Sequence, residues 1–117
     1  MSWDAYSAYA GNSWCQIVGL PGGEVWSTHA GAVAGPITLA NGASAAPVLT
    51  GPAGKFMGFP PRDPSDLTDY MKFKKGDLSG VKIQCAKCAV IAVAQGPPPD
   101  AVAAAEAVAN VIKGAGY

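Results

Sequence analysis

Residues 81–94, VKIQCAKCAVIAVA, contain the two patterns that decide the fold of this chain. Residues 81–85 alternate apolar and polar side chains, which is the period of a strand with one face in water. Residues 88–94 are apolar throughout, which predicts a central strand that is buried on both faces. The chain is therefore expected to be built around a sheet that includes these two strands.

Weaker patterns before this segment predict the rest of the sheet. Strands are expected at residues 14–20, 24–28, 55–59 and 69–75, because apolar and β-branched residues gather there between glycine and proline turns. Residues 31–54 are rich in glycine, alanine and proline, and we expect a loop with one weak helix around residues 37–46.

Each end of the chain predicts a helix. Residues 2–10 form a short amphipathic stretch that Ser2 can cap and Gly11 can close. After three prolines, Asp100 is expected to cap a helix over residues 100–113, which carries apolar residues at spacings of three and four. The element order predicts an α+β fold, with one antiparallel sheet packed by the terminal helices.

The composition predicts one domain, over residues 1–117, that works in the cytosol. Half of the residues are apolar, which is enough for a single core and too few for two. No apolar run long enough to span a membrane occurs, and the first twenty residues carry Asp4 but no lysine or arginine, so no secretory signal is expected. The three cysteines, an odd number, are expected to be reduced thiols.

The charges balance overall but are unevenly distributed. Every basic residue lies at or beyond Lys55, and the net charge is zero. Two interpretations of the basic segment are open: a patch for an acidic protein face or anionic phosphoinositide lipids, or a solvated strand face whose lysines protect a sheet edge. Nucleic acid is disfavoured as a partner, because the chain has no basic excess. The segment contains five lysines: Lys72, Lys74, Lys75, Lys82 and Lys87.

Aromatic residues mark both ends of the chain. Trp3 and Tyr6 are three residues apart, so one helical turn presents both rings on one side, and the last residue is Tyr117. With Trp26, they give the chain a resemblance to profilin, a family of small proteins that bind actin monomers and poly-proline. The resemblance implies a sheet of about six strands with both terminal helices on one face. It also implies a poly-proline site made of Trp3, Tyr6, Trp26 and Tyr117, with Ile112 as an apolar wall.

The same resemblance implies an actin-binding surface on two strands and on the outer face of the C-terminal helix. Family members carry basic or amide side chains at the start of that helix, where this chain has alanines, so we expect weaker actin binding. The residues that carry over to this surface are Lys55, Met57, Lys72, Lys74, Lys75, Lys87 and Glu106.

The motif Cys85-Ala86-Lys87-Cys88 allows a different class of function, a small thiol or metal-binding domain. A redox pair with this spacing normally opens a helix, whereas strand patterns flank both cysteines here. A structural zinc ion needs four ligands, and beyond this pair the chain offers only the distant Cys15 and the single His29. We interpret the cysteines as small strand residues, and the thiol alternative requires a lowered pKa at Cys85 or Cys88.

We therefore expect a monomeric binding protein, with no enzymatic activity, cofactor or bound metal, in the cytoplasm and associated with the cytoskeleton. Its expected partners are monomeric actin and proline-rich proteins such as actin assembly factors, with phosphoinositides as a further candidate. One alternative is a profilin-fold poly-proline adaptor that does not bind actin. The other is the thiol or metal-binding domain.

Overall fold

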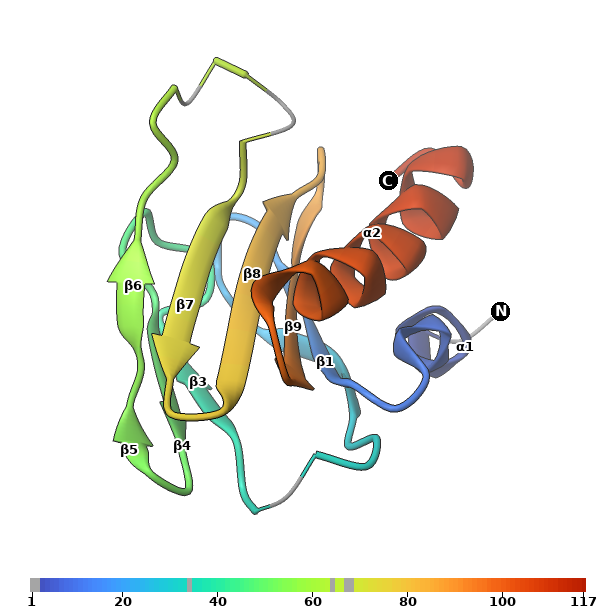
Figure 1. The fold of residues 1–117 in the computed structure, drawn as a ribbon. Coiled ribbons are helices and arrows are strands. Elements are labelled where there is room, and N and C mark those ends of the chain that lie inside the picture. The colour runs from blue at the N-terminus through green and yellow to red at the C-terminus, as the bar shows by residue number, and fades with distance from the viewer. Residues whose placement is uncertain (1–2, 34, 64, 67–68) are drawn as a thin grey trace.

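The computed structural model describes residues 3–33, 35–63, 65–66 and 69–117, and its centre is a six-stranded antiparallel sheet (Figure 1). The strand order is β2-β1-β9-β8-β7-β6. This confirms the predicted sheet. Its strands are β1 (Trp14–Gly19), β2 (Val25–His29), β6 (Met57–Phe59), β7 (Met71–Lys75), β8 (Leu78–Gln84) and β9 (Cys88–Gln95).

The apolar strand β9 lies near the middle of the sheet, paired with β1 on one side and β8 on the other. All of its residues except Gln95 are buried. Helices cover one face of the strand and a second, smaller sheet covers the other, so both faces of β9 require apolar side chains. The alternation in β8 is less complete, because even Lys82 is buried there.

Both terminal helical segments pack on the same face of the sheet (Figure 1). They are α1 (Trp3–Ser7), continued by the 3₁₀ turn η1 (Ala8–Ala10), and α2 (Pro98–Gly114). The predicted N-terminal helix is confirmed from Trp3 onward, whereas the proposed cap Ser2 lies outside the described residues. Gly11 closes the segment with a φ of 63°, a conformation that glycine adopts without steric cost.

The predicted start of the C-terminal helix at Asp100 is wrong by two residues. The helix begins at Pro98, with Pro97 in the capping position and no side-chain cap hydrogen bond. Proline suits the first helical turn, because its φ is already helical and the missing N–H has no partner there in any helix. Asp100 lies in the first turn instead, where its carboxylate meets the positive end of the helix dipole.

The helix expected around residues 37–46 is also wrong. This part of the chain contains β3 (Thr38–Ala40), which pairs with β4 (Val48–Gly51), and β4 pairs with β5 (Gly54–Lys55). The small second sheet packs its Leu49 against the far face of the main sheet.

The strand expected over residues 55–59 is split at Phe56. Its ring is buried between the two sheets, and its N–H donates to the carbonyl of Leu49 at 2.8 Å. The chain thereby passes from β5 in the second sheet to β6 in the main sheet.

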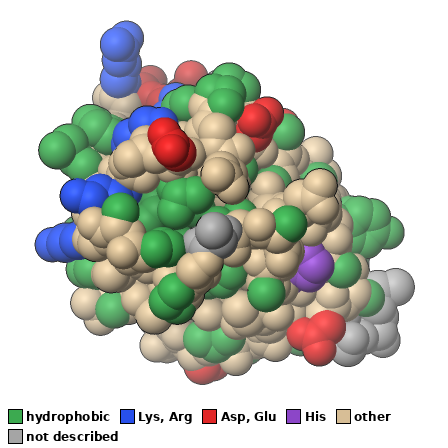
Figure 2. Space-filling view, turned by 60° about the horizontal axis from the view of Figure 1, so that its bottom comes forward, with side chains coloured by type: hydrophobic (Ala, Val, Ile, Leu, Met, Phe, Trp, Pro, Cys, Tyr) green, Lys and Arg blue, Asp and Glu red, His purple; other side chains and the backbone are tan. Residues whose placement is uncertain are grey.

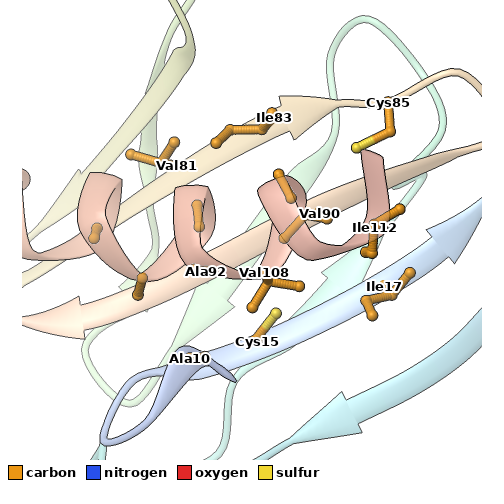
Figure 3. Packing of buried hydrophobic residues seen from close by; sticks show 14 of the residues in the cluster. Ala10, Cys15, Ile17, Val81, Ile83, Cys85, Val90, Ala92, Val108 and Ile112 are labelled. Atoms are coloured by element: carbon orange, nitrogen blue, oxygen red, sulfur yellow. The ribbon is translucent and has the colours of Figure 1, made fainter. Parts of the chain in front are cut away.

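The main core lies between the sheet and α2 (Figure 3). On the strands it is built from alternate residues that share the helix side of the sheet, and α2 contributes mostly alanines, which allow close approach. None of the helices in the described part of the chain is long and apolar enough to span a membrane. The residues of this core that Figure 3 labels are Ala10, Cys15, Ile17, Val81, Ile83, Cys85, Val90, Ala92, Val108 and Ile112.

Candidate functional site

Four aromatic rings from distant parts of the chain meet beside the two terminal helices, and we call them the aromatic cluster. The ring centroid of Trp3 lies 4.6 Å from that of Trp26, 5.3 Å from Tyr6 and 5.0 Å from Tyr117. The contacts with Tyr6 and Tyr117 are edge-to-face, a favourable arrangement for aromatic pairs. None of the four rings is fully buried. The four aromatic residues expected to form one site therefore do lie together.

A β-bulge in the pairing of β1 with β2 turns two neighbouring side chains of β2 toward the helices. The register shifts between Ile17 and Val18, so Trp26 is the extra residue. Trp26 packs on the helix-side core, and the adjacent Ser27 is also directed toward α1. A regular strand would send these two side chains to opposite faces.

Hydrogen bonds from β2 hold α1 in place. The Ser27 hydroxyl donates to the carboxylate of Asp4 at 2.5 Å and lies 2.8 Å from the hydroxyl of Ser7. Ser7 and Ser27 are both buried, so these bonds satisfy groups that have lost contact with water. The bonds fix the position of Trp3, which is in the same helix.

The C-terminal residue is attached to the turn between β8 and β9. The Lys87 N–H donates to the carbonyl of Tyr117 at 2.9 Å, and the Lys87 ammonium lies 5.7 Å from the centroid of the Tyr117 ring. Such a cation contributes about 0.5–1 kcal/mol at an exposed ring. Lys87 was expected on the actin surface, but the structure places it beside the aromatic cluster.

Ile112 differs from its expected role as a wall of the poly-proline site. Its side chain is completely buried in the core between α2 and the sheet (Figure 3). In this position it supports the cluster from beneath and has no surface to offer to a ligand.

The second candidate surface is on strands β6 and β7, and we call it the β6–β7 face. Met57 lies opposite Lys74, and Phe59 lies opposite Lys72, so all four side chains share the helix side of the sheet. Met57 is 65% exposed and Phe59 47%. Phe59 was missed from the sequence, although its spacing of two from Met57 would have placed both on one strand face.

The remaining lysines do not join this face. Lys75 follows Lys74 in β7 and therefore points to the opposite side, where a side chain on Gly54 of β5 would meet it. Lys55 is in β5 itself. Figure 2 shows the basic side chains gathered on the left, the side on which Figure 1 has β5, β6 and β7.

Lys82 is buried on the second-sheet side, where its ammonium donates to the carbonyl of Ser44 at 2.7 Å. Burial lowers the pKa of Lys82 below its ordinary value. The five lysines of the basic segment thus do not form one patch.

Glu106 is half-buried on α2, near Tyr70 at the approach to β7. Burial, and then the negative charge of Glu106, raise the pKa of Tyr70. This acidic residue therefore lies on the part of α2 that is turned toward β7.

Cys85 and Cys88 face each other at the end of the β8–β9 hairpin, while Cys15 is buried in β1. A hydrogen bond from Cys88 and the charge of Lys113 lower the pKa of Cys85 to about 7, against an opposing effect of burial. The thiol alternative required such a lowered pKa. Among the described residues, no group of three or more His, Cys, Asp or Glu side chains could hold a metal ion.

Both candidate surfaces are open. A pocket of about 390 Å³ lies elsewhere, between Pro60, Tyr70, Met71 and Lys82, and its lining includes neither the aromatic cluster nor Lys72 and Lys74. Open aromatic and basic surfaces suit a macromolecular partner better than an enclosed small molecule.

No protein-family model matches the chain, and no curated protein matches it significantly. Two solved structures are similar: profilin IA and profilin II of Acanthamoeba castellanii, with TM-scores of 0.66 and 0.64. Each is 16% identical to this chain, and each alignment covers 99% of this chain and 100% of the profilin. The chain therefore has the profilin fold, as the aromatic residues and the element order predicted.

Proposed function

We propose that this chain binds proline-rich segments at the aromatic cluster and actin monomers at the β6–β7 face, and that it regulates actin polymerisation in this way. The observation that carries the proposal is the convergence of Trp3, Tyr6, Trp26 and Tyr117 on a profilin fold. The proposal implies a binding protein rather than an enzyme, and a cytoplasmic location together with actin.

The chemistry of the aromatic cluster suits a polyproline II helix. Such a helix is already ordered before it binds, and it presents flat proline rings and carbonyls without internal hydrogen bonds. Aromatic faces pack against the rings, while the indole N–H of Trp3 or Trp26 and the phenol O–H of Tyr6 or Tyr117 can donate to the carbonyls. Because the Trp3 ring contacts each of the other three, little side-chain entropy remains to be lost on binding.

Retention on poly-proline resin tests this half of the proposal. Trp3→Ala removes the ring that contacts the other three and should abolish retention. Tyr9→Ala is a matched control, because Tyr9 is 58% exposed in the same N-terminal segment but lies outside the cluster. Equal retention of the wild type and Trp3→Ala, with both folded by circular dichroism, would refute the site.

The β6–β7 face has the composition of a protein-binding surface. The exposed Met57 and Phe59 provide an apolar centre, and Lys72 and Lys74 provide a basic rim toward an acidic partner such as actin. The alanines of α2 allow close contact but offer few hydrogen bonds, so we expect weak affinity. A dose-dependent delay of actin nucleation tests this half, and no delay at large excess would leave a poly-proline adaptor.

Phosphoinositide binding is a secondary part of the proposal. Lys72 and Lys74, which share one exposed face of β7, can attract an anionic bilayer, at about 1 kcal/mol for each lysine near the surface. Such binding should be weak and should disappear in high salt. Vesicle sedimentation at low and high ionic strength decides it, since salt-resistant binding would contradict an electrostatic origin.

A further inference from the structure

Cys85 and Cys88 are free cysteines that lie opposite each other across one turn. Both side chains belong to the core on the helix side of the sheet, Cys85 directly after β8 and Cys88 at the start of β9, and the nearby Cys88 side chain lowers the pKa of Cys85. The Cys85 N–H donates to the Cys88 carbonyl at 2.8 Å, which keeps the two residues opposite each other. The two thiols therefore lie on one face at the end of one hairpin.

The two residues between the cysteines, Ala86 and Lys87, are exposed, and Lys87 is connected to the aromatic cluster. The Lys87 N–H binds the Tyr117 carbonyl at 2.9 Å, and the Lys87 carbonyl accepts from Leu20 N–H at 3.0 Å. A change in the geometry of this turn would therefore be transmitted to Tyr117.

The two thiols differ in reactivity, and Cys15 differs from both. The groups that face Cys85 are Cys88, Lys113 and Tyr70. The first two lower the pKa of Cys85 to about 7, so a large fraction is thiolate at neutral pH, whereas burial raises the pKa of Cys15 to about 12. Cys85 is also 6% exposed, whereas Cys15 and Cys88 are 0% exposed. Cys85 is thus the attacking thiol and Cys88 the resolving thiol.

We propose that Cys85 and Cys88 form a reversible disulfide whose formation displaces Tyr117 and weakens the binding of proline-rich ligands. The oxidant is a small disulfide of the glutathione type. The Cys85 thiolate attacks one of its sulfur atoms, forming a mixed disulfide and expelling the other half as a thiolate. Cys88 then attacks the Cys85 sulfur, and its proton passes to the second departing thiolate. The protein loses two electrons and two protons, and the small disulfide is reduced to two thiols.

The modification itself is tested without any ligand. After incubation with oxidised glutathione at about pH 8, where the Cys85 thiolate dominates, the three titratable thiols should fall to one. Peptide mapping should join Cys85 to Cys88 and leave Cys15 free. Cys88→Ser should trap glutathione on Cys85, and Cys85→Ser should form no adduct. Retention of all three thiols, or reaction at Cys15 first, overturns the proposal.

The regulatory consequence rests on the proposed function, so it has a separate measurement. Oxidised wild type should bind poly-proline about two- to tenfold more weakly, which is the loss of affinity expected when one aromatic contact is removed. Reduction with dithiothreitol should restore binding, and Cys85→Ala with Cys88→Ala should not respond to oxidant. If reduced protein does not bind poly-proline, the proposed function fails while the disulfide result still stands. If the disulfide forms and affinity is unchanged, the coupling to Tyr117 is wrong.

Discussion

Replacing Gly19 by alanine should disturb the aromatic cluster from beneath. A methyl group at Gly19 would lie 2.6 Å from two carbons of the Trp26 indole and 2.6 Å from a carboxylate oxygen of Glu24. Glu24 is exposed and can swing away, but the indole is held between the sheet and the Trp3 ring. The indole must therefore shift, and overpacking of this kind costs about 1–3 kcal/mol of unfolding free energy.

Urea denaturation measures this cost, and Gly114→Ala is the control. Nothing lies within 4 Å of a methyl group at Gly114, the last residue of α2, so this variant should gain up to about 1 kcal/mol from helix propensity. The two Gly→Ala changes should thus have opposite signs. Gly19→Ala should also change tryptophan emission and lower retention on poly-proline resin. Unchanged stability and emission in Gly19→Ala would show that Trp26 is not packed as described.

Three further predictions test other contacts. Lys74→Glu should weaken actin binding by about 1–2 kcal/mol, because a reversed rim charge both loses an attraction and adds a repulsion. Lys75→Glu, on the opposite strand face, should have a smaller effect in the same nucleation assay. Asp4→Ala should cost about 1–2 kcal/mol by removing the acceptor of the Ser27 hydroxyl, and hydrogen exchange should show lost protection in α1 but not in α2. Burial lowers the pKa of Lys82 from 10.5, so just below pH 10.5 the unfolded chain binds more protons than the folded chain. The free energy of unfolding should therefore rise with pH in this range, and Lys82→Met should remove the rise.

Patterns of apolar residues predicted those strands and helices whose own residues form a long apolar run or show a clear periodicity. Strand β9 is a long apolar run, and α2 has apolar residues at helical spacing, so each was recognisable without its neighbours. Strands β3 and β4 were missed because they are short and lie in a segment rich in glycine, alanine and proline. They form only through pairing with each other and through packing of Leu49 on the main sheet, contacts that local patterns do not contain.

The positions of the candidate site residues were only partly predictable. The profilin resemblance predicted which residues form the aromatic cluster. Their geometry depends on a β-bulge at Trp26, and no sequence pattern indicates this bulge. The separation of Lys74 from Lys75 could have been deduced, because neighbouring strand residues point to opposite faces. The burial of Lys82 could not, since the carbonyl that accepts its hydrogen bond belongs to Ser44, 38 residues away.

The strand order also decides how the proposed activities relate to one another. Trp26 is on β2, and the β6–β7 face begins at β7, four strand spacings away, which is about 19 Å at about 4.8 Å per spacing. The two proposed partners would therefore contact different residues, and one molecule could hold both. The Cys85–Cys88 turn contacts the aromatic cluster through Tyr117 and does not contribute to the β6–β7 face. Oxidation would thus weaken the binding of a proline-rich partner and leave the actin surface intact, so one site could be regulated without the other.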